Sequence, residues 1–360
     1  MVKLQAIIIG ALLACNIKAD LIAPNCPPPP PPTCSTGTCA PTVTDNNIVY
    51  GYGNNLVGNL NTLTGSGNTV QGYVNTIAGN NNLNLGSYST IVGSNNAAQG
   101  NYNQIAGNLN GVIGSVNTVV GSANGVVGNY NGVNGNLNQL VGDANLVNGS
   151  VNTVAGNLNT IANGNYNTIG GTQNVVNNGN YNGILGTANY VQGSANNVNG
   201  TANALVGNYN LVGGAYNNVA GSGNGVAGDC NNLVGDSNAV VGSANNLNGY
   251  SNQVQGSVNT LQGSFNNIGG SANTAIGNTN NILGVSNTAF GSNNNLYGAL
   301  NSVLGNQNTA TGVANTIVGN SNLAAGVGNS QIGTGNVAIG NANSQFGYSN
   351  TAIGCANSAV

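Results

Sequence analysis

The sequence predicts an all-β protein, a parallel β-solenoid (β-roll) in which very short strands stack on one another. A glycine recurs every seven residues from Gly51 to Gly354, with only two slips of one residue. An asparagine stands three residues after the glycine in 43 of the 44 repeats, and Ser89 is the exception. A mostly apolar residue lies in the middle of the three residues that follow. A fixed short period of this kind is typical of solenoids.

Each seven-residue repeat combines a corner with a three-residue strand. Glycine reaches positive φ without steric cost, and asparagine tolerates tight turns. Segments such as "TLT" and "TIA" after the asparagine favour β-branched residues, with the middle side chain pointing inward. Glycine and asparagine at fixed positions argue against a coiled-coil heptad.

Two repeats per coil give a 14-residue flattened roll of about 22 coils. A triangular coil of 21 residues is the competing arrangement. The slips, at Asn163–Gly164 and Asn178–Gly179, favour the smaller coil because adjoining coils can absorb one extra residue each. Stacked asparagines are expected to form amide ladders. The core is thin, so we also expect self-association into a homo-oligomer.

Residues 1–19 resemble a secretory signal, with Lys3, an apolar run from Leu4 to Ala14 and a small residue at Ala19. Eleven apolar residues are too few to span a bilayer. The alternative interpretation is a lipoprotein box, "LLAC", with Cys15 as a lipidated terminus. The mature chain is expected to be secreted, free outside the cell or attached to its surface, with no integral membrane segment.

Residues 20–47 form a Pro/Cys-rich extended head or linker, and residues 48–360 form the solenoid. Six consecutive prolines favour polyproline II. In a secreted chain cysteines indicate disulfides. Five candidates remain after signal removal, and an odd number leaves one for pairing between chains; free, half-buried thiols in the roll are the alternative for the last two. The candidates are Cys26, Cys34, Cys39, Cys230 and Cys355.

Composition excludes several classes of function. The only basic residues, Lys3 and Lys18, lie in the predicted signal, and the mature chain keeps five aspartates. A chain without basic residues has no electrostatic surface for nucleic acid or anionic lipid. No histidine is present and the cysteine spacing does not fit a metal knuckle, so no metal and no cofactor are expected.

Enzymatic activity is not expected, because histidine and glutamate are absent and the mature chain has no basic residue. Asp229 and Asp236 are the one carboxylate pair considered, since two carboxylates are the minimum for glycoside hydrolysis. Both occupy the variable position after a glycine, where Ser or Asn usually stands. We interpret them as exposed turn substituents.

Tyrosines two residues after the repeat glycine are the candidate binding residues. Aromatic side chains in a row can stack on sugars or pack against another chain. Covering the corners of the roll is the alternative role. The candidates are Tyr88, Tyr102, Tyr130, Tyr166, Tyr181 and Tyr209.

From Asn273 the repeats become "NTAIG", "NTAFG" and "NVAIG", and the large apolar residue moves next to the glycine, as at Ile276 and Phe290. Here the chain resembles the head repeats of trimeric autotransporter adhesins, the YadA-like family. The resemblance implies a left-handed parallel β-roll that trimerises. The heptad stalk and the membrane anchor of that family are not recognised in this sequence.

The sequence favours a secreted, non-catalytic structural or adhesive protein of a cell surface, wall or extracellular coat, with surface glycans as candidate partners. The alternative is an ice-binding or carbohydrate-binding β-solenoid. A flat face of regularly spaced threonines would indicate ice, but along the sequence Thr62, Thr69, Thr76 and Thr90 give way to other residues. A disordered Asn/Gly-rich chain is a third hypothesis, which the regular apolar position contradicts.

Overall fold

The computed structural model describes residues 42–44 and 46–360. The predicted signal, Cys15 and the cysteines Cys26, Cys34 and Cys39 lie outside these residues. The chain divides into two compact blocks, block 1 up to Asn182 and block 2 from Gly183 to Val360. The part of the chain that the structure describes contains strands and no helix, and hence no helix able to cross a bilayer.

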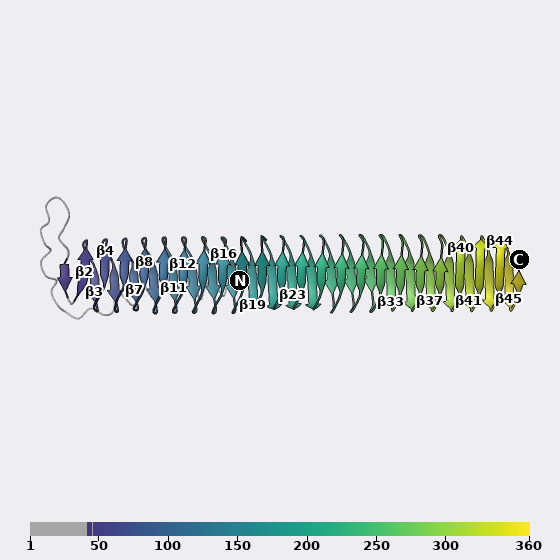
Figure 1. The fold of residues 1–360 in the computed structure, drawn as a ribbon, viewed down its shortest axis with the longest axis horizontal. Helices are drawn as coiled ribbons and strands as arrows, with labels where there is room; N and C mark the ends of the chain where they lie inside the picture. Colours follow the sequence, from purple (N-terminus) through teal and green to yellow (C-terminus); the bar gives the residue numbers. More distant parts are fainter. Residues whose placement is uncertain (1–41, 45) are drawn as a thin grey trace. The chain divides into compact units, whose positions relative to one another are not determined.

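Block 1 is a β-roll of very short strands, which Figure 1 shows side by side as successive rungs. Its strands are β1 Thr42–Thr44, β2 Asn47–Tyr50, β3 Asn55–Val57, β4 Thr62–Thr64, β5 Thr69–Gln71, β6 Thr76–Ala78, β7 Leu83–Leu85, β8 Thr90–Val92, β9 Ala97–Gln99, β10 Gln104–Ala106, β11 Gly111–Ile113, β12 Thr118–Val120, β13 Gly125–Val127, β14 Gly132–Asn134, β15 Gln139–Val141, β16 Leu146–Asn148, β17 Thr153–Ala155, β18 Thr160–Ala162, β19 Thr168–Thr172 and β20 Val175–Asn177.

Block 2 repeats the same architecture, and many of its strands extend to five residues. They are β21 Gly183–Thr187, β22 Tyr190–Gln192, β23 Asn197–Thr201, β24 Ala204–Val206, β25 Leu211–Ala215, β26 Asn218–Ala220, β27 Gly225–Ala227, β28 Asn232–Val234, β29 Ala239–Val241, β30 Asn246–Asn248, β31 Gln253–Gln255, β32 Thr260–Gln262, β33 Asn267–Ser271, β34 Thr274–Ile276, β35 Asn281–Val285, β36 Thr288–Phe290, β37 Asn295–Ala299, β38 Ser302–Leu304, β39 Thr309–Val313, β40 Thr316–Asn320, β41 Leu323–Val327, β42 Ser330–Thr334, β43 Val337–Asn341, β44 Ser344–Tyr348, β45 Thr351–Cys355 and β46 Ser358–Ala359.

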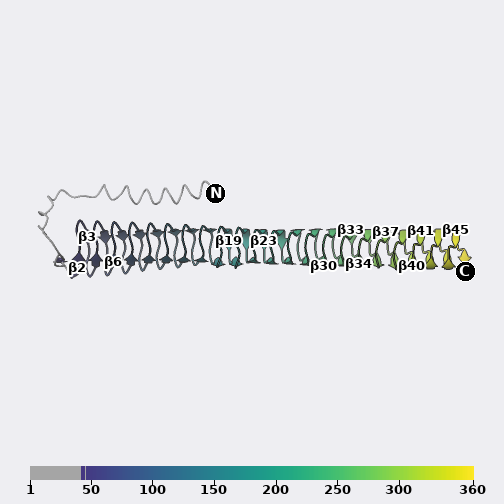
Figure 2. The ribbon, with the colours of Figure 1, turned by 90° about the horizontal axis from the view of Figure 1, so that it is seen from above.

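In each block the even-numbered strands form one parallel sheet, sheet A, and the odd-numbered strands from β3 form sheet B on the opposite side (Figure 2). Thr62 of β4 pairs with Thr76 of β6, and Thr69 of β5 pairs with Leu83 of β7. One coil therefore holds two repeats, which confirms the 14-residue coil and excludes the 21-residue alternative. Strands β2 to β46 make about 22 turns, as predicted. In block 1, β1 pairs antiparallel with β2 at the start of sheet A.

The two register slips stack on each other. Thr153 pairs with Thr168 and Thr160 with Val175, each 15 residues along the chain instead of 14. The extra residues, Asn163 and Asn178, sit on the same corner, where the Nδ2 of Asn163 donates to the Oδ1 of Asn178 at 3.3 Å. Adjoining coils absorb one residue each, as the sequence indicated.

The corner glycine is required by backbone conformation and by the next coil. Gly65 has φ of +125°, and a Cβ there would overlap the carbonyl oxygen of Gly79. Two residues after the glycine the chain also has positive φ, even at Val74, where φ is 58°. For a β-branched residue this conformation is unfavourable.

Asparagine ladders run along the inside of the roll, one before the strands of each sheet. Asn61 donates from its backbone N to the Oδ1 of Asn47 at 2.8 Å, and from its Nδ2 to the same atom at 3.1 Å and to the Gly72 carbonyl oxygen at 2.9 Å. These buried amides satisfy the backbone at the corners, where no strand pairing is possible. The predicted ladder is confirmed.

Each sheet contributes one layer of side chains to the core, and the second residue of nearly every strand is buried. In block 1 this residue is mostly Val, Ile or Leu. In block 2 it is small or polar in several strands from β34 onward: Ala275 and Ala289 are fully buried, and Gln331 and Gln345 enter the core of sheet A, whereas Val303 and Ile317 keep the core apolar between them. The large apolar residue then occupies the outer position next to the glycine.

Candidate functional site

A column of threonines stands on the outer face of sheet A in block 1. Each member is the first residue of its strand, so its side chain points away from the core. Register places Thr62 opposite Thr76, Thr76 opposite Thr90, and Gln104 between Thr90 and Thr118. Four of five consecutive rungs, β4 to β12, therefore carry a threonine at one position. We name this set the threonine column: Thr62, Thr76, Thr90 and Thr118, interrupted by Gln104.

A second column beside it consists of small residues. The third residues of the same strands are Thr64, Ala78, Val92, Ala106 and Val120, and they align in the same register. All residues of both columns are exposed or half-exposed. Neighbouring rungs are separated by ~4.8 Å. Apart from Gln104, every side chain of the two columns is Thr, Val or Ala, so this face repeats nearly evenly.

The threonine pattern is more regular on one sheet than along the sequence. Thr69 belongs to β5 of sheet B, so it does not interrupt the column that Thr62 and Thr76 form on sheet A. On sheet A between β4 and β12 the only substitution in the column is Gln104, so the lattice there is more regular than the sequence indicates. Comparing every fourteenth residue, rather than every seventh, is the sequence signal that reveals this column.

Block 2 has a longer hydroxyl column on sheet A, at the first positions of β32 to β46. Register aligns its members from Thr260 to Ser358. The neighbouring outer positions are bulky and exposed, at Ile276 36%, Phe290 40%, Leu304 54%, Val318 36%, Ile332 45% and Phe346 59%. We call these six residues the outer apolar column. Their unequal sizes make this face uneven, unlike the face of block 1.

The candidate tyrosines are exposed, but they do not form one row. Tyr88 and Tyr102 follow strands of sheet B and stack with ring centroids 4.9 Å apart and an interplanar angle of 6°. Tyr130 is on the same corner, after β13. Tyr166 and Tyr181 follow strands of sheet A and stack in the same way. Tyr209 of block 2 follows β24 and is 75% exposed.

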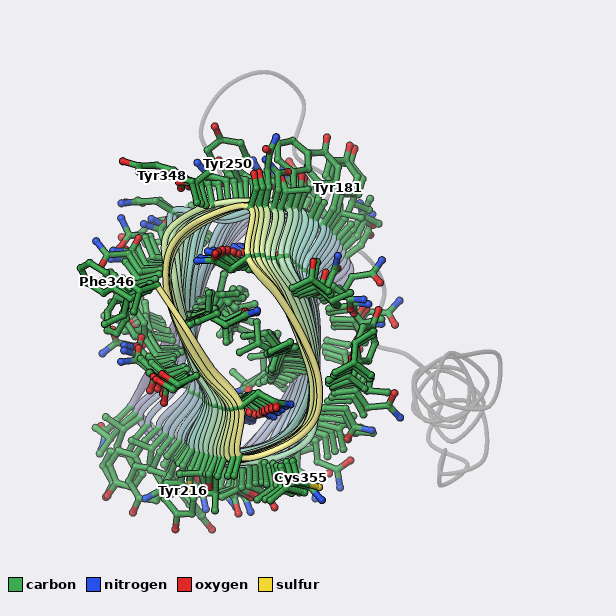
Figure 3. All side chains as sticks on the ribbon, turned by 90° about the vertical axis from the view of Figure 1, so that its right-hand side faces the viewer. Tyr181, Tyr216, Tyr250, Phe346, Tyr348 and Cys355 are labelled. Atoms are coloured by element: carbon green, nitrogen blue, oxygen red, sulfur yellow. The ribbon has the colours of Figure 1, made fainter. Side chains whose placement is uncertain are left out.

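Side chains of block 2 occupy both corners and the face between them. Figure 3 shows Tyr250 and Tyr348 at one corner, Tyr216 and Cys355 at the opposite corner, and Phe346 on the face between them. Cys230 and Cys355 are both free and exposed, so they are neither half-buried nor paired with each other. They remain candidates for pairing between chains.

The two aspartates considered for catalysis lie on opposite corners of block 2, after β27 and after β28. The Oδ1 of Asp229 accepts the backbone N–H of Ala215 at 2.7 Å, and the Oδ1 of Asp236 accepts that of Ser222 at 2.6 Å. In equivalent repeats Asn and Ser side chains make the same contact, as between Ser66 N and Asn80 Oδ1. Both carboxylates therefore accept a backbone hydrogen bond at a corner of the roll. Among residues 42–44 and 46–360, no group of three or more potential metal ligands occurs.

The sequence model of a family described as the grass antifreeze beta roll matches residues 140–235. The match covers 96 of the 360 residues and falls on strands β15 to β28. No curated protein sequence matches the chain. The match agrees with the β-roll fold, whereas the resemblance to autotransporter heads is not confirmed. The matched segment lacks a regular threonine column, since the first residues of its sheet A strands include Leu146, Val175 and Tyr190.

Proposed function

We propose that this protein is an ice-binding β-roll, and that the outer face of sheet A in block 1, from β4 to β12, contacts the ice. The match to an antifreeze β roll supports the first statement. The observation that carries the second is the in-register threonine column beside a column of small residues. Ice binding is the alternative function that the sequence indicates, and the match favours it over the structural or adhesive role.

The proposed mechanism follows from the geometry of the face. Each threonine presents a hydroxyl and a methyl group, and each recurs at the strand spacing of ~4.8 Å. Hydroxyl groups fixed at equal intervals hold ordered water, and the methyl groups between them leave that water few alternative partners. A face that already holds water in a regular array needs little reorganisation to join a crystal.

Rigidity is the contribution of the rest of the roll. The buried Asn61 and Asn75 amides fix neighbouring coils in one register behind the threonine column. Flat parallel sheets are stabilised by such side-chain ladders. Many weak contacts then act together, because one rung cannot leave the ice surface while its neighbours remain bound.

The proposal places the protein outside the cell and assigns it no catalytic activity. An extracellular location agrees with the signal predicted in residues 1–19. The surface of block 1 suits a neutral crystal, because its only charged side chain among residues 46–182 is Asp143, on a corner and not on the threonine face.

Thermal hysteresis of the purified full chain tests this function. We expect ice crystals to stop growing in a temperature interval below their melting point, and to develop facets. Crystals that grow as round discs at every undercooling, at protein concentrations of ~1 mM, would exclude ice binding. The variants that locate the face are given at the end of the Discussion.

A further inference from the structure

The outer face of sheet A in block 2 reverses the usual placement of side chains in a strand. In β42 and β44 the buried second residues are Gln331 and Gln345, whereas Ile332 and Phe346 next to them are 45% and 59% exposed. In β34 and β36, Ala275 and Ala289 are buried beside the exposed Ile276 and Phe290. The core is small or polar behind four of the six residues of the outer apolar column, and apolar, at Val303 and Ile317, behind Leu304 and Val318. A row of exposed apolar side chains over such a core is typical of an interaction surface.

The buried glutamines make this reversal costly. The Nε2 of Gln331 donates to the Leu323 carbonyl oxygen at 2.7 Å and to the Oε1 of Gln345 at 2.8 Å. Its own Oε1 has no hydrogen-bond partner among the described residues. A buried unpartnered acceptor is destabilising, so the pattern is not explained by the stability of block 2 alone.

We propose that a second copy of this chain covers the outer apolar column, with the two faces related by a two-fold axis that runs parallel to the strands, between β38 and β40. Rotation about this axis reverses the order of the rungs in the second copy. The outer apolar column of one copy then faces the outer apolar column of the other. It places Ile276 opposite Phe346, Phe290 opposite Ile332, and Leu304 opposite Val318 of the other copy. Each phenylalanine meets an isoleucine, and no two phenylalanines collide.

The hydroxyl column is self-complementary about the same axis. Reversal places Thr260 opposite Ser358, Thr274 opposite Ser344, Thr288 opposite Ser330, and Ser302 opposite Thr316. Every pair joins one threonine with one serine, so the larger side chain of one copy always meets the smaller of the other. A two-fold interface requires this reciprocity, because residue i contacts j while j contacts i.

Charge also favours a second copy as the occupant. Residues 237–360 contain no Asp, Glu, Lys, Arg or His. Two such faces meet without repulsion and without burying an ion. Eight strands at ~4.8 Å and a width of about 10–15 Å give a face of roughly 500 Å² per copy. This is less than the ~800 Å² per partner of a stable complex, so the dimer is weak and forms at high concentration.

Sedimentation equilibrium of the full chain tests the proposal. We expect the wild-type mass to rise from monomer to dimer with a midpoint on the order of 100 µM. Leu304→Glu and Val318→Lys each put an unpaired charge into the interface, so each variant alone should stay monomeric. An equimolar mixture of the two should dimerise, because the axis brings the two substituted positions together across the interface.

Leu283→Glu on β35 is the matched control, since Leu283 is 53% exposed at an outer position of sheet B. It should dimerise as the wild type does, and circular dichroism should show that all variants fold. A wild type that stays monomeric up to ~0.5 mM, single variants that dimerise normally, or a mixture that stays monomeric would each overturn the proposal. Thermal hysteresis lost in Leu304→Glu, with a monomeric wild type, would assign this face to ice instead.

Discussion

The Nδ2 of Asn75 donates to the Oδ1 of Asn61, one coil earlier, at 2.9 Å, and also to the Gly86 carbonyl oxygen at 2.9 Å. The backbone N of Asn75 donates to the same Oδ1 at 3.0 Å. At the next rung of this ladder Ser89 has no amide: its backbone N donates to the Oδ1 of Asn75 at 2.9 Å, and its Oγ accepts the backbone N–H of Asn103 at 3.3 Å but does not reach the amide of Asn75 or a corner glycine carbonyl. Ser89 is thus the one weak rung that the sequence shows.

Ser89→Asn should stabilise block 1 by about 1–2 kcal/mol, because the new amide can donate both to Asn75 and to a corner carbonyl. Asn117→Ala, at an intact rung of the same ladder, should lower the free energy of unfolding by roughly 2–4 kcal/mol, since it leaves buried groups unpaired. Urea unfolding followed by circular dichroism measures both. An unchanged midpoint for Ser89→Asn would show that the ladder contributes little.

Asn84 is a polar residue at a core position and should be replaceable by an apolar one. It is fully buried in β7, its Oδ1 has no partner among the described residues, and its Nδ2 makes only a long bond of 3.3 Å to Gly86 O. Asn84→Val should raise the free energy of unfolding by about 1–2 kcal/mol.

Val70→Asn, at the paired position of β5, is the control for Asn84→Val. Val70 is 1% exposed, so the same exchange in reverse should destabilise the roll by roughly 2–3 kcal/mol. If both variants shifted the urea midpoint in the same direction, burial of an unpartnered amide would not be the cause of the change in stability.

Gly65→Ala tests the packing of one coil on the next. The added Cβ would overlap Gly79 O, and φ of +125° is unfavourable for alanine, so we expect a loss of roughly 3 kcal/mol or more. Gly225→Ala is the control, because nothing lies within 4 Å of a Cβ at that position. It should change the free energy of unfolding by less than about 0.5 kcal/mol. Hydrogen exchange of the corner amides would show whether damage stays local.

The period of seven residues was sufficient to predict the fold. It specified the corner at Gly65, the buried side chain at Leu63 and the amide at Asn61, because each coil presents the same environment to the next. The slips at Asn163 and Asn178 even indicated the coil length. A solenoid is predictable in this way because each repeat contacts only its neighbours.

The candidate surface was harder to predict, because a surface depends on which residues share a sheet. Thr62, Thr69 and Thr76 read as one series in the sequence, but the fold places Thr69 on the opposite sheet. Similarly, Tyr102 and Tyr166 belong to different corners. In the sequence, the exposed side chain of Phe346 could be recognised only as a shift of the large apolar residue toward the glycine. The sequence did not indicate which residue Phe346 faces in the proposed dimer.

Thermal hysteresis of two matched tyrosine variants tests the central claim most directly. Thr76→Tyr places a bulky side chain between Thr62 and Thr90, in the uninterrupted part of the threonine column. Thr69→Tyr places the same side chain at the same strand position of sheet B. We predict that Thr76→Tyr lowers the hysteresis activity about tenfold, because neighbouring rungs lose contact with ice together, and that Thr69→Tyr keeps wild-type activity. Equal activity of the two variants, or a selective loss in Thr69→Tyr, would contradict the assignment of ice binding to this face.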